Sequence, residues 1–81
     1  MKKLKFTKHA EQKLSDRNIN KTSIRIALEK PDELLIGEND MKIVHRAENN
    51  KILRVFFRED EYNYIIITAY LTSKEKYKVK T

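Results

Sequence analysis

The chain has 81 residues, with 18 Lys and Arg side chains against 12 Asp and Glu, and so a net charge of +6. This length accommodates one domain. The absence of cysteine excludes a disulfide framework and a thiolate zinc site. The single glycine, Gly37, excludes glycine-rich phosphate loops and the nucleophile elbow. With no long apolar run and no signal-peptide pattern, we expect one soluble, cytoplasmic domain over residues 1–81 with an anionic partner, most often nucleic acid.

The acidic residues are unevenly distributed. Seven of the twelve fall in residues 32–40 and 59–61, and both stretches are predicted as loops. Either these are ordinary solvated loop tips, or the helices and strands present a more basic surface than the net charge implies. The two histidines, His9 and His45, lie far apart in the sequence, so we expect neither a metal site nor a cofactor.

The N-terminal segment predicts a strand followed by a helix. Leu4 and Phe6 alternate with lysines, which is typical of a short edge strand protected by charge. Thr7 is a suitable N-cap for a helix over about 8–17. The apolar face of this helix carries two residues four apart, Ala10 and Leu14.

A second helix is predicted over about 21–30. Asn18 can adopt the left-handed conformation that ends the first helix, and Asn20 can cap the second. Pro31 ends it. Its buried stripe comprises Ile24, Ala27 and Leu28.

From residue 41 onward the hydrophobic period changes to two, which predicts strands over 41–48, 51–58 and 63–71. Asn49-Asn50 suits a two-residue type I′ turn, which would place His45 opposite Arg54. A three-residue loop at 60–62 would then place Arg58 opposite Tyr64 and Arg54 opposite Thr68. Residues directly opposite share a face, so the two faces of the sheet can be derived.

One predicted face is apolar apart from Arg46, and we expect it to pack on the helices. It carries Val44, Leu53, Val55, Phe57, Ile65, Ile67, Ala69 and Leu71. The predicted fold is therefore α+β, with two N-terminal helices on one face of a twisted antiparallel sheet of about four strands. The opposite, open face carries His45, Arg54, Arg58, Tyr64, Thr68 and Tyr70 among Ile43, Phe56 and Ile66.

The open face contains the groups that cleave RNA without metal. That reaction requires a base for the 2′-hydroxyl, an acid for the leaving 5′-oxygen and a cation for the phosphorane. His45 suits proton transfer, Arg54 suits the phosphate, and Tyr70 can donate a proton or stack on a base. The alternative is a solvated sheet face with incidental polar residues.

A basic stripe on the first helix extends this surface. His9, Lys13 and Arg17 follow at i, i+4 and i+8, so they form either a rim that grips phosphates or an ordinary exposed helix face. Residues 72–81 alternate lysines with Tyr77 and Val79, which indicates either a short last strand or a basic tail.

Several short motifs resemble those of a known family. They are Phe6-Thr7-Lys8-His9-Ala10, Arg17-Asn18-Ile19, Leu53-Arg54-Val55-Phe56 and Ile67-Thr68-Ala69-Tyr70. Together they resemble domain-of-unknown-function family 4258, which is similar to the RelE/ParE toxins. The resemblance implies two helices on one face of an antiparallel sheet, and toxins that cut RNA, often messenger RNA on the ribosome, under the control of an antitoxin. It highlights His9, Arg17, Thr68 and Tyr70.

The leading hypothesis is a metal-independent endoribonuclease that acts as the toxin of a toxin–antitoxin pair. Its partners would be RNA, including ribosome-bound mRNA, and a cognate antitoxin. The alternatives are a non-catalytic nucleic-acid-binding module and a protein-directed toxin or interaction domain. The candidate catalytic residues are His45, Arg54, His9 and Tyr70. The candidate RNA-binding residues are Lys13, Arg17, Arg58, Tyr64 and Thr68.

Overall fold

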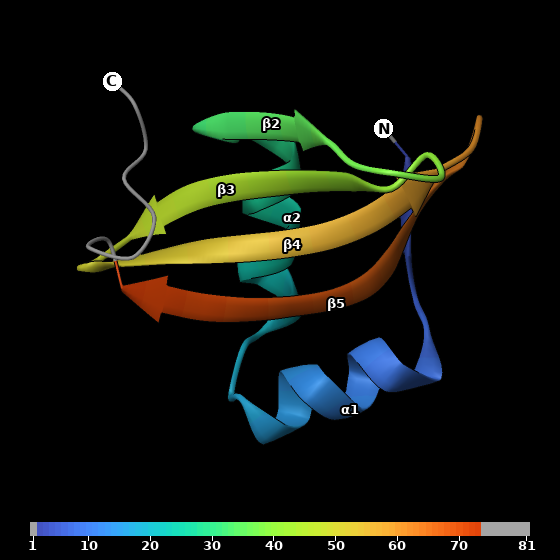
Figure 1. Ribbon diagram of the computed structural model, residues 1–81. Helices are drawn as coiled ribbons and strands as arrows, with labels where there is room; N and C mark the ends of the chain where they lie inside the picture. Colours follow the sequence, from blue (N-terminus) through green and yellow to red (C-terminus); the bar gives the residue numbers. More distant parts are fainter. Residues whose placement is uncertain (1, 74–81) are drawn as a thin grey trace.

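A computed structural model describes residues 2–73 and contains two helices and a five-stranded sheet. In chain order the elements are β1 (Lys3–Phe6), α1 (Lys8–Asp16), α2 (Lys21–Glu29), β2 (Glu33–Ile36), β3 (Lys42–Glu48), β4 (Lys51–Glu59) and β5 (Asn63–Ser73). The strand order across the sheet is β1-β5-β4-β3-β2. Figure 1 shows α2 behind the sheet and α1 along β5, so neither helix of residues 2–73 covers the other face of the sheet. The predicted α+β architecture is confirmed.

Both helices begin at the predicted caps. The Ala10 backbone N–H donates to the Thr7 hydroxyl at 3.0 Å, and the Ser23 N–H donates to the Asn20 side chain at 2.8 Å. These bonds satisfy backbone donors that the first turn of a helix leaves without an intrahelical acceptor. Asn18 adopts a positive φ of 55° just after α1, as predicted for the residue that ends the first helix.

The β3–β4 hairpin has the predicted register. Glu48 lies opposite Lys51, and His45 lies opposite Arg54. The turn type is different, however. Asn49 has a φ of 57°, whereas Asn50 is outside the left-handed region, and a type I′ turn requires positive φ at both central residues.

The two edge strands of the sheet differ from the expected meander. The residues Glu33–Ile36, predicted as loop, form β2, which pairs antiparallel with β3. At the other edge β1 pairs with β5 in the parallel direction, and both helices and strands β2 to β4 lie between these two strands in the chain. The sheet is therefore mixed and has one strand more than the expected four.

The predicted β4–β5 register is wrong. Glu59 lies opposite Tyr64, and Phe57 lies opposite Ile66. A β-bulge follows, so that Phe56 lies opposite Thr68 and Ile67 has no residue directly opposite. Tyr64 and Ile66 consequently face the helices, and not the open face to which the sequence assigned them. Ile65 and Ile67 are excluded from the buried core for the same reason.

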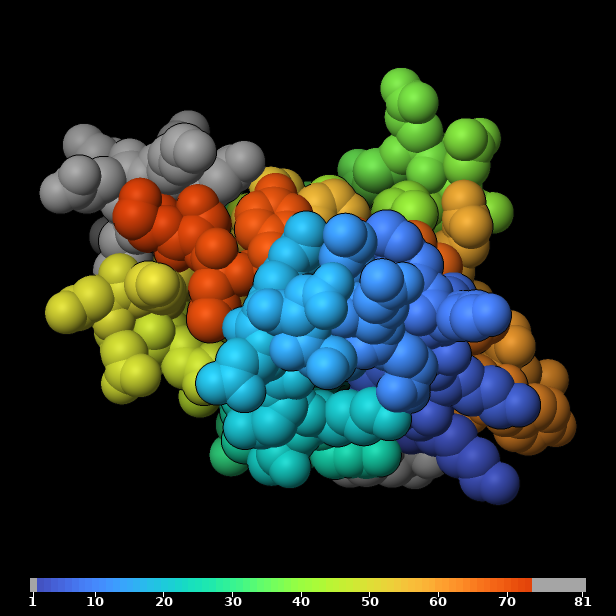
Figure 2. Space-filling model, turned by 90° about the horizontal axis from the view of Figure 1, so that it is seen from below, coloured from blue at the N-terminus to red at the C-terminus, as the bar shows by residue number. Residues whose placement is uncertain are grey.

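The hydrophobic core lies between the sheet and the two helices. Its buried members are Ala10, Leu14, Ile19, Ile24, Ala27, Leu28, Val44, Leu53, Val55, Phe57, Ile66 and Ala69. Helix α2 packs against β3 and β4, and α1 packs against β5, where Figure 2 shows it at the surface. Arg46, on the helix side of β3, donates to the Lys30 carbonyl at 2.6 Å, which satisfies an acceptor at the C-terminal end of α2.

Within residues 2–73 no helix is long and apolar enough to cross a membrane. The expected basic tail begins inside β5, which continues to Ser73. Residues 74–81 lie outside the described part of the chain.

Candidate nucleic-acid interface on the open sheet face

Four polar side chains form a row across four strands of the open face. Cross-strand pairing places Glu33 beside His45, His45 beside Arg54, and Arg54 beside Tyr70. The His45 Nδ1 lies 2.8 Å from the Glu33 carboxylate, and the Arg54 Nε lies 2.8 Å from the His45 Nε2. An Arg54 Nη1 donates to the Tyr70 hydroxyl oxygen. We call these four residues the polar row.

The polar row defines the tautomer of His45. A guanidinium can only donate, so the His45 Nε2 that faces Arg54 is the acceptor, and Nδ1 carries the proton that is donated to Glu33. His45 is also buried, with 3% of its surface exposed. Both ring nitrogens therefore connect neighbouring charged groups, and the imidazole orients Arg54.

Two aromatic rings, those of Phe56 and Tyr70, lie beside the Arg54 guanidinium. Its central carbon lies 5.0 Å from the centroid of the Phe56 ring and 5.4 Å from that of Tyr70, and the two rings stack with centroids 5.8 Å apart. Cation–π contacts of this kind contribute about 0.5–2 kcal/mol each and restrict the guanidinium. Beside the polar row runs a mostly apolar row, made of Leu35, Ile43, Phe56 and Thr68.

Arg17 brings a second guanidinium to the same place. It follows the last turn of α1 and donates to the Ala69 carbonyl at 2.9 Å and to the Thr68 hydroxyl at 3.4 Å. Its guanidinium carbon lies 5.8 Å from the Tyr70 ring centroid. Arg17 and Arg54 thus both contact Tyr70, and two cations from distant parts of the chain meet at one phenol.

The rest of the predicted rim lies farther from this cluster. His9 and Arg17 are eight residues apart, which is about 12 Å along a helix axis. His9 is exposed near the start of α1, and Lys13, which is half-buried, lies between the two. The basic stripe is continuous along α1, but only its Arg17 end touches the polar row among the contacts of the described residues.

Two predicted RNA-binding residues lie away from the cluster. Tyr64 faces the helix side, where its ring packs edge-on against Phe57 at 5.6 Å and Lys2 lies over it at 5.3 Å. It is therefore removed from the candidate site. Arg58 stays on the open face opposite Ile65, exposed, and donates to the Asn39 carbonyl at 3.2 Å.

Sequence reasoning missed Glu33 as a site residue. Its position in an acidic stretch indicated a loop, and the run Leu34-Leu35-Ile36 that follows was the only signal of a strand. Once β2 pairs with β3, Glu33 lies directly opposite His45 and orients its ring.

Glu59, at the last position of β4 on the helix side of the sheet, pairs with two lysines. Hydrogen bonds from Lys2 and Lys42, each at 2.5 Å, hold the pKa of Glu59 below its ordinary value. Backbone N–H groups of Tyr62 and Asn63 and the Asn63 side chain likewise lower the pKa of Asp60. These shifts are explained by local ion pairing and turn formation.

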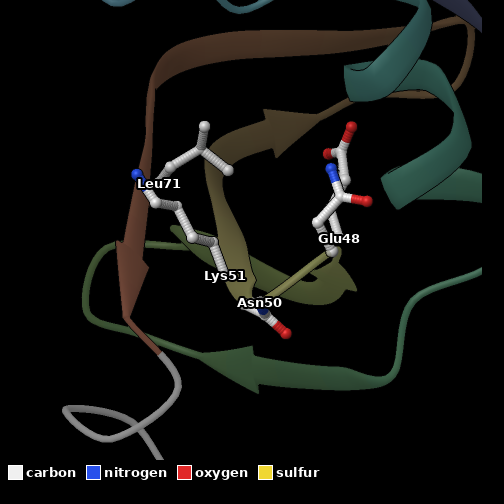
Figure 3. Close-up of a pocket in the computed structure, with 5 residues that line it drawn as sticks. Glu48, Asn50, Lys51 and Leu71 are labelled. Atoms are coloured by element: carbon white, nitrogen blue, oxygen red, sulfur yellow. The ribbon is translucent and has the colours of Figure 1, made fainter.

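A shallow hollow at the other end of the sheet contains none of the predicted site residues. Figure 3 shows Glu48, Asn50, Lys51 and Leu71 around it, from the β3–β4 turn and β5. Glu48 accepts from the Ser23 hydroxyl at 3.2 Å, so the carboxylate is used to attach α2 to the sheet. Among residues 2–73 no group of three or more His, Cys, Asp or Glu side chains is arranged to hold a metal ion.

Comparison with known protein families identifies the family of the chain. The family described as Domain of unknown function (DUF4258) matches residues 6–71, which include both helices and most of the sheet. No curated protein and no solved structure matches the chain.

Proposed function

The chain belongs to the DUF4258 family, and we propose that it is a metal-independent endoribonuclease of the RelE/ParE toxin type, which acts on RNA in the cytoplasm and is neutralised by an antitoxin. One observation carries this proposal: Arg54 and Arg17 meet at the Tyr70 ring on the face that neither of the two described helices covers. Paired guanidinium groups are well suited to a phosphate, because each offers a planar fork of donors to two oxygens.

The cluster supports distinct roles for its members. Arg54 and Arg17 bind the scissile phosphate and stabilise the extra negative charge of the phosphorane. The Tyr70 oxygen accepts from Arg54, and the role proposed for its O–H is to donate a proton to the leaving oxygen. His45, buried and bonded through both nitrogens, positions Arg54 and does not itself take a proton from substrate.

The reaction is an internal phosphoryl transfer. The 2′-oxygen forms a bond to phosphorus while the bond from phosphorus to the 5′-oxygen breaks. One proton leaves the 2′-hydroxyl for a base, and one reaches the 5′-oxygen from an acid, so the products are a 2′,3′-cyclic phosphate and a 5′-hydroxyl. Tyr70 serves as the acid. Water takes the proton of the 2′-hydroxyl, because His9, the exposed imidazole on the basic stripe, lies about 12 Å along the helix axis from Arg17, too far to act as the base at a phosphate held there.

A second candidate function is non-catalytic binding of single-stranded nucleic acid. The observation that favours it is the environment of the two histidines: His45 is buried between Glu33 and Arg54, and His9 lies about two helical turns from Arg17. Stacking on Phe56 and phosphate contacts from the arginines require neither imidazole.

The test is incubation of the purified chain with single-stranded RNA in EDTA, followed by analysis of the product termini. The proposal predicts 2′,3′-cyclic phosphate products. Tyr70→Phe and Arg54→Lys should each lower the cleavage rate about 10²–10³-fold, since each removes one transition-state interaction. Lys21→Ala is the matched control, because it removes one positive charge from an exposed ion pair with Glu11 and should leave the rate unchanged.

Binding and cleavage are measured on the same variants. RNA that is bound with a steep salt dependence but never cleaved would support the binding module and overturn the nuclease. Cleavage that persists unchanged in Arg54→Lys and Tyr70→Phe would place the chemistry elsewhere. Failure to bind RNA at all would overturn both functions.

A further inference from the structure

Strand β2 ends the sheet as an exposed apolar edge. Leu34 and Ile36 have 53% and 69% of their surface exposed, and Leu35 is exposed as well. Only β3 pairs with β2 among the described strands. A free edge of this kind is a template for a further strand, and natural sheets usually protect it with charge, proline or a covering element. None of the three residues of β2 that follow Glu33 supplies such protection.

The pairing with β3 fixes which backbone groups are available. The Gly37 N–H donates to the Met41 carbonyl directly opposite, at 2.7 Å. Hydrogen-bonded and non-hydrogen-bonded pairs alternate along an antiparallel ladder, so the N–H and C=O groups of Leu34 and Ile36 point away from β3. Two residues thus offer both a donor and an acceptor to an incoming strand.

The flanks of β2 are strongly acidic. Asp32 and Glu33 lie at its start, and Glu38 and Asp40 lie in the loop after it, with no basic residue anywhere in residues 32–40. Glu38 and Asp40 are exposed and form no ion pair within residues 2–73. Lys42, opposite Ile36, is already paired with Glu59 at 2.5 Å.

Charge decides between the possible occupants of this edge. Pairing of β2 with β2 of a second copy would bring two acidic flanks together, and like charges on neighbouring strands destabilise the pair. A strand that alternates apolar and basic residues would place its apolar side chains beside Leu34 and Ile36 and its cations beside the acidic flanks.

From these observations we propose that the β2 edge binds an extended basic segment of a partner protein by β-augmentation, with lysines or arginines alternating with apolar residues. Backbone hydrogen bonds to Leu34 and Ile36 provide the pairing, and the acidic flanks select the cationic strand. The proposal concerns the opposite edge of the sheet from α1 and is independent of the proposed nuclease activity.

The probe is an eight-residue peptide in which lysine alternates with valine, titrated into the ¹⁵N-labelled full chain. The largest amide shifts should fall within residues 32–37. A glutamate–valine peptide of the same length should bind at least tenfold more weakly. An absence of binding, equal binding of both peptides, or shifts confined to other strands would overturn the proposal.

Two variants test the two parts of the interaction. Leu34→Pro removes an outward N–H without a ladder bond to β3 and should abolish binding, whereas Leu34→Thr keeps the N–H and should retain it. The double variant Glu38→Lys, Asp40→Lys leaves β2 itself unchanged and should weaken binding of the lysine–valine peptide about tenfold. It tests the acidic flanks even if the Leu34→Pro variant does not fold. Unchanged affinity in the double variant would refute the charge selection.

Self-association is measured by sedimentation of the same samples. The proposal expects the wild-type chain to show no dimer that depends on β2. A dimer that Leu34→Pro dissociates while Leu34→Thr preserves it would show that a second copy occupies the edge, and would overturn the assignment to a basic partner strand.

Discussion

Replacement of His45 by alanine should destabilise the fold considerably. The buried imidazole joins a carboxylate and a guanidinium, each at 2.8 Å, so His45→Ala removes two hydrogen bonds to charged groups. Such bonds contribute about 1.5–3 kcal/mol each. The net loss is smaller than their sum, because the Glu33 side chain is one-third exposed and regains water and Arg54 keeps its bond to Tyr70.

We therefore expect His45→Ala to lower the free energy of unfolding by about 2–3 kcal/mol. A chain of this size has about 4–12 kcal/mol in total. Urea denaturation followed by far-ultraviolet circular dichroism measures the change. With an m-value of about 1 kcal/mol per molar urea, the midpoint should fall by about 2–3 M at unchanged m.

A matched variant separates the hydrogen bond from the charge. Glu33→Gln keeps an oxygen that accepts from the His45 Nδ1–H, so it should cost only about 1 kcal/mol. If His45→Ala lowered stability by less than about 0.5 kcal/mol, as is usual for surface substitutions, the imidazole would not connect the row, and its proposed positioning of Arg54 would be refuted.

Three further predictions test the core, a turn and an ion pair. Ile66→Ala should lower the free energy of unfolding by about 2–4 kcal/mol because Ile66 is fully buried, whereas Ile67→Ala at the bulge should lower it markedly less. Equal losses of stability in urea denaturation would contradict the observed register. Asn49→Ala should cost about 1–2 kcal/mol because of its positive φ, while Asn49→Gly should be close to neutral in the same assay. Lys2 and Lys42 lower the pKa of Glu59, so the stability that this pairing contributes is present above the unfolded pKa of about 4.5 and is lost as pH falls through the lower folded pKa. Glu59→Gln should therefore flatten the acidic part of a plot of Tm against pH. An unchanged acidic part of that plot would contradict the pairing.

Local signals in the sequence predicted the helices and the central hairpin correctly. Thr7 and Asn20 form their cap bonds to residues three positions away, so the signal for each helix start lies in the local sequence. The two-residue loop between β3 and β4 similarly fixes the pairing of His45 with Arg54 from the connection alone.

The edge strands depended on distant partners and were harder to predict. β2 has four residues and no alternation after Glu33, because Leu34, Leu35 and Ile36 are all apolar. Its strand conformation is stabilised by pairing with β3. The parallel pairing of β1 likewise depends on a strand about 60 residues later in the chain, β5, which no pattern within Lys3–Phe6 encodes.

The predicted register of β5 contains two errors that cancel beyond Ile67, so most of the candidate site was nevertheless placed on the correct face. Ile65, Ile66 and Ile67 are identical, so hydrophobic alternation cannot decide which of them face the core. The β4–β5 loop is one residue longer than expected, which moves Tyr64 and Ile66 to the helix side.

The bulge then adds a second residue of displacement. Since side chains alternate with a period of two, two single-residue displacements restore the original faces beyond Ile67, and Thr68 and Tyr70 lie on the open face as predicted. Their partners nevertheless change. Arg54 lies opposite Tyr70 and not Thr68, and this two-residue shift brings the phenol to the guanidinium on which the proposed chemistry depends.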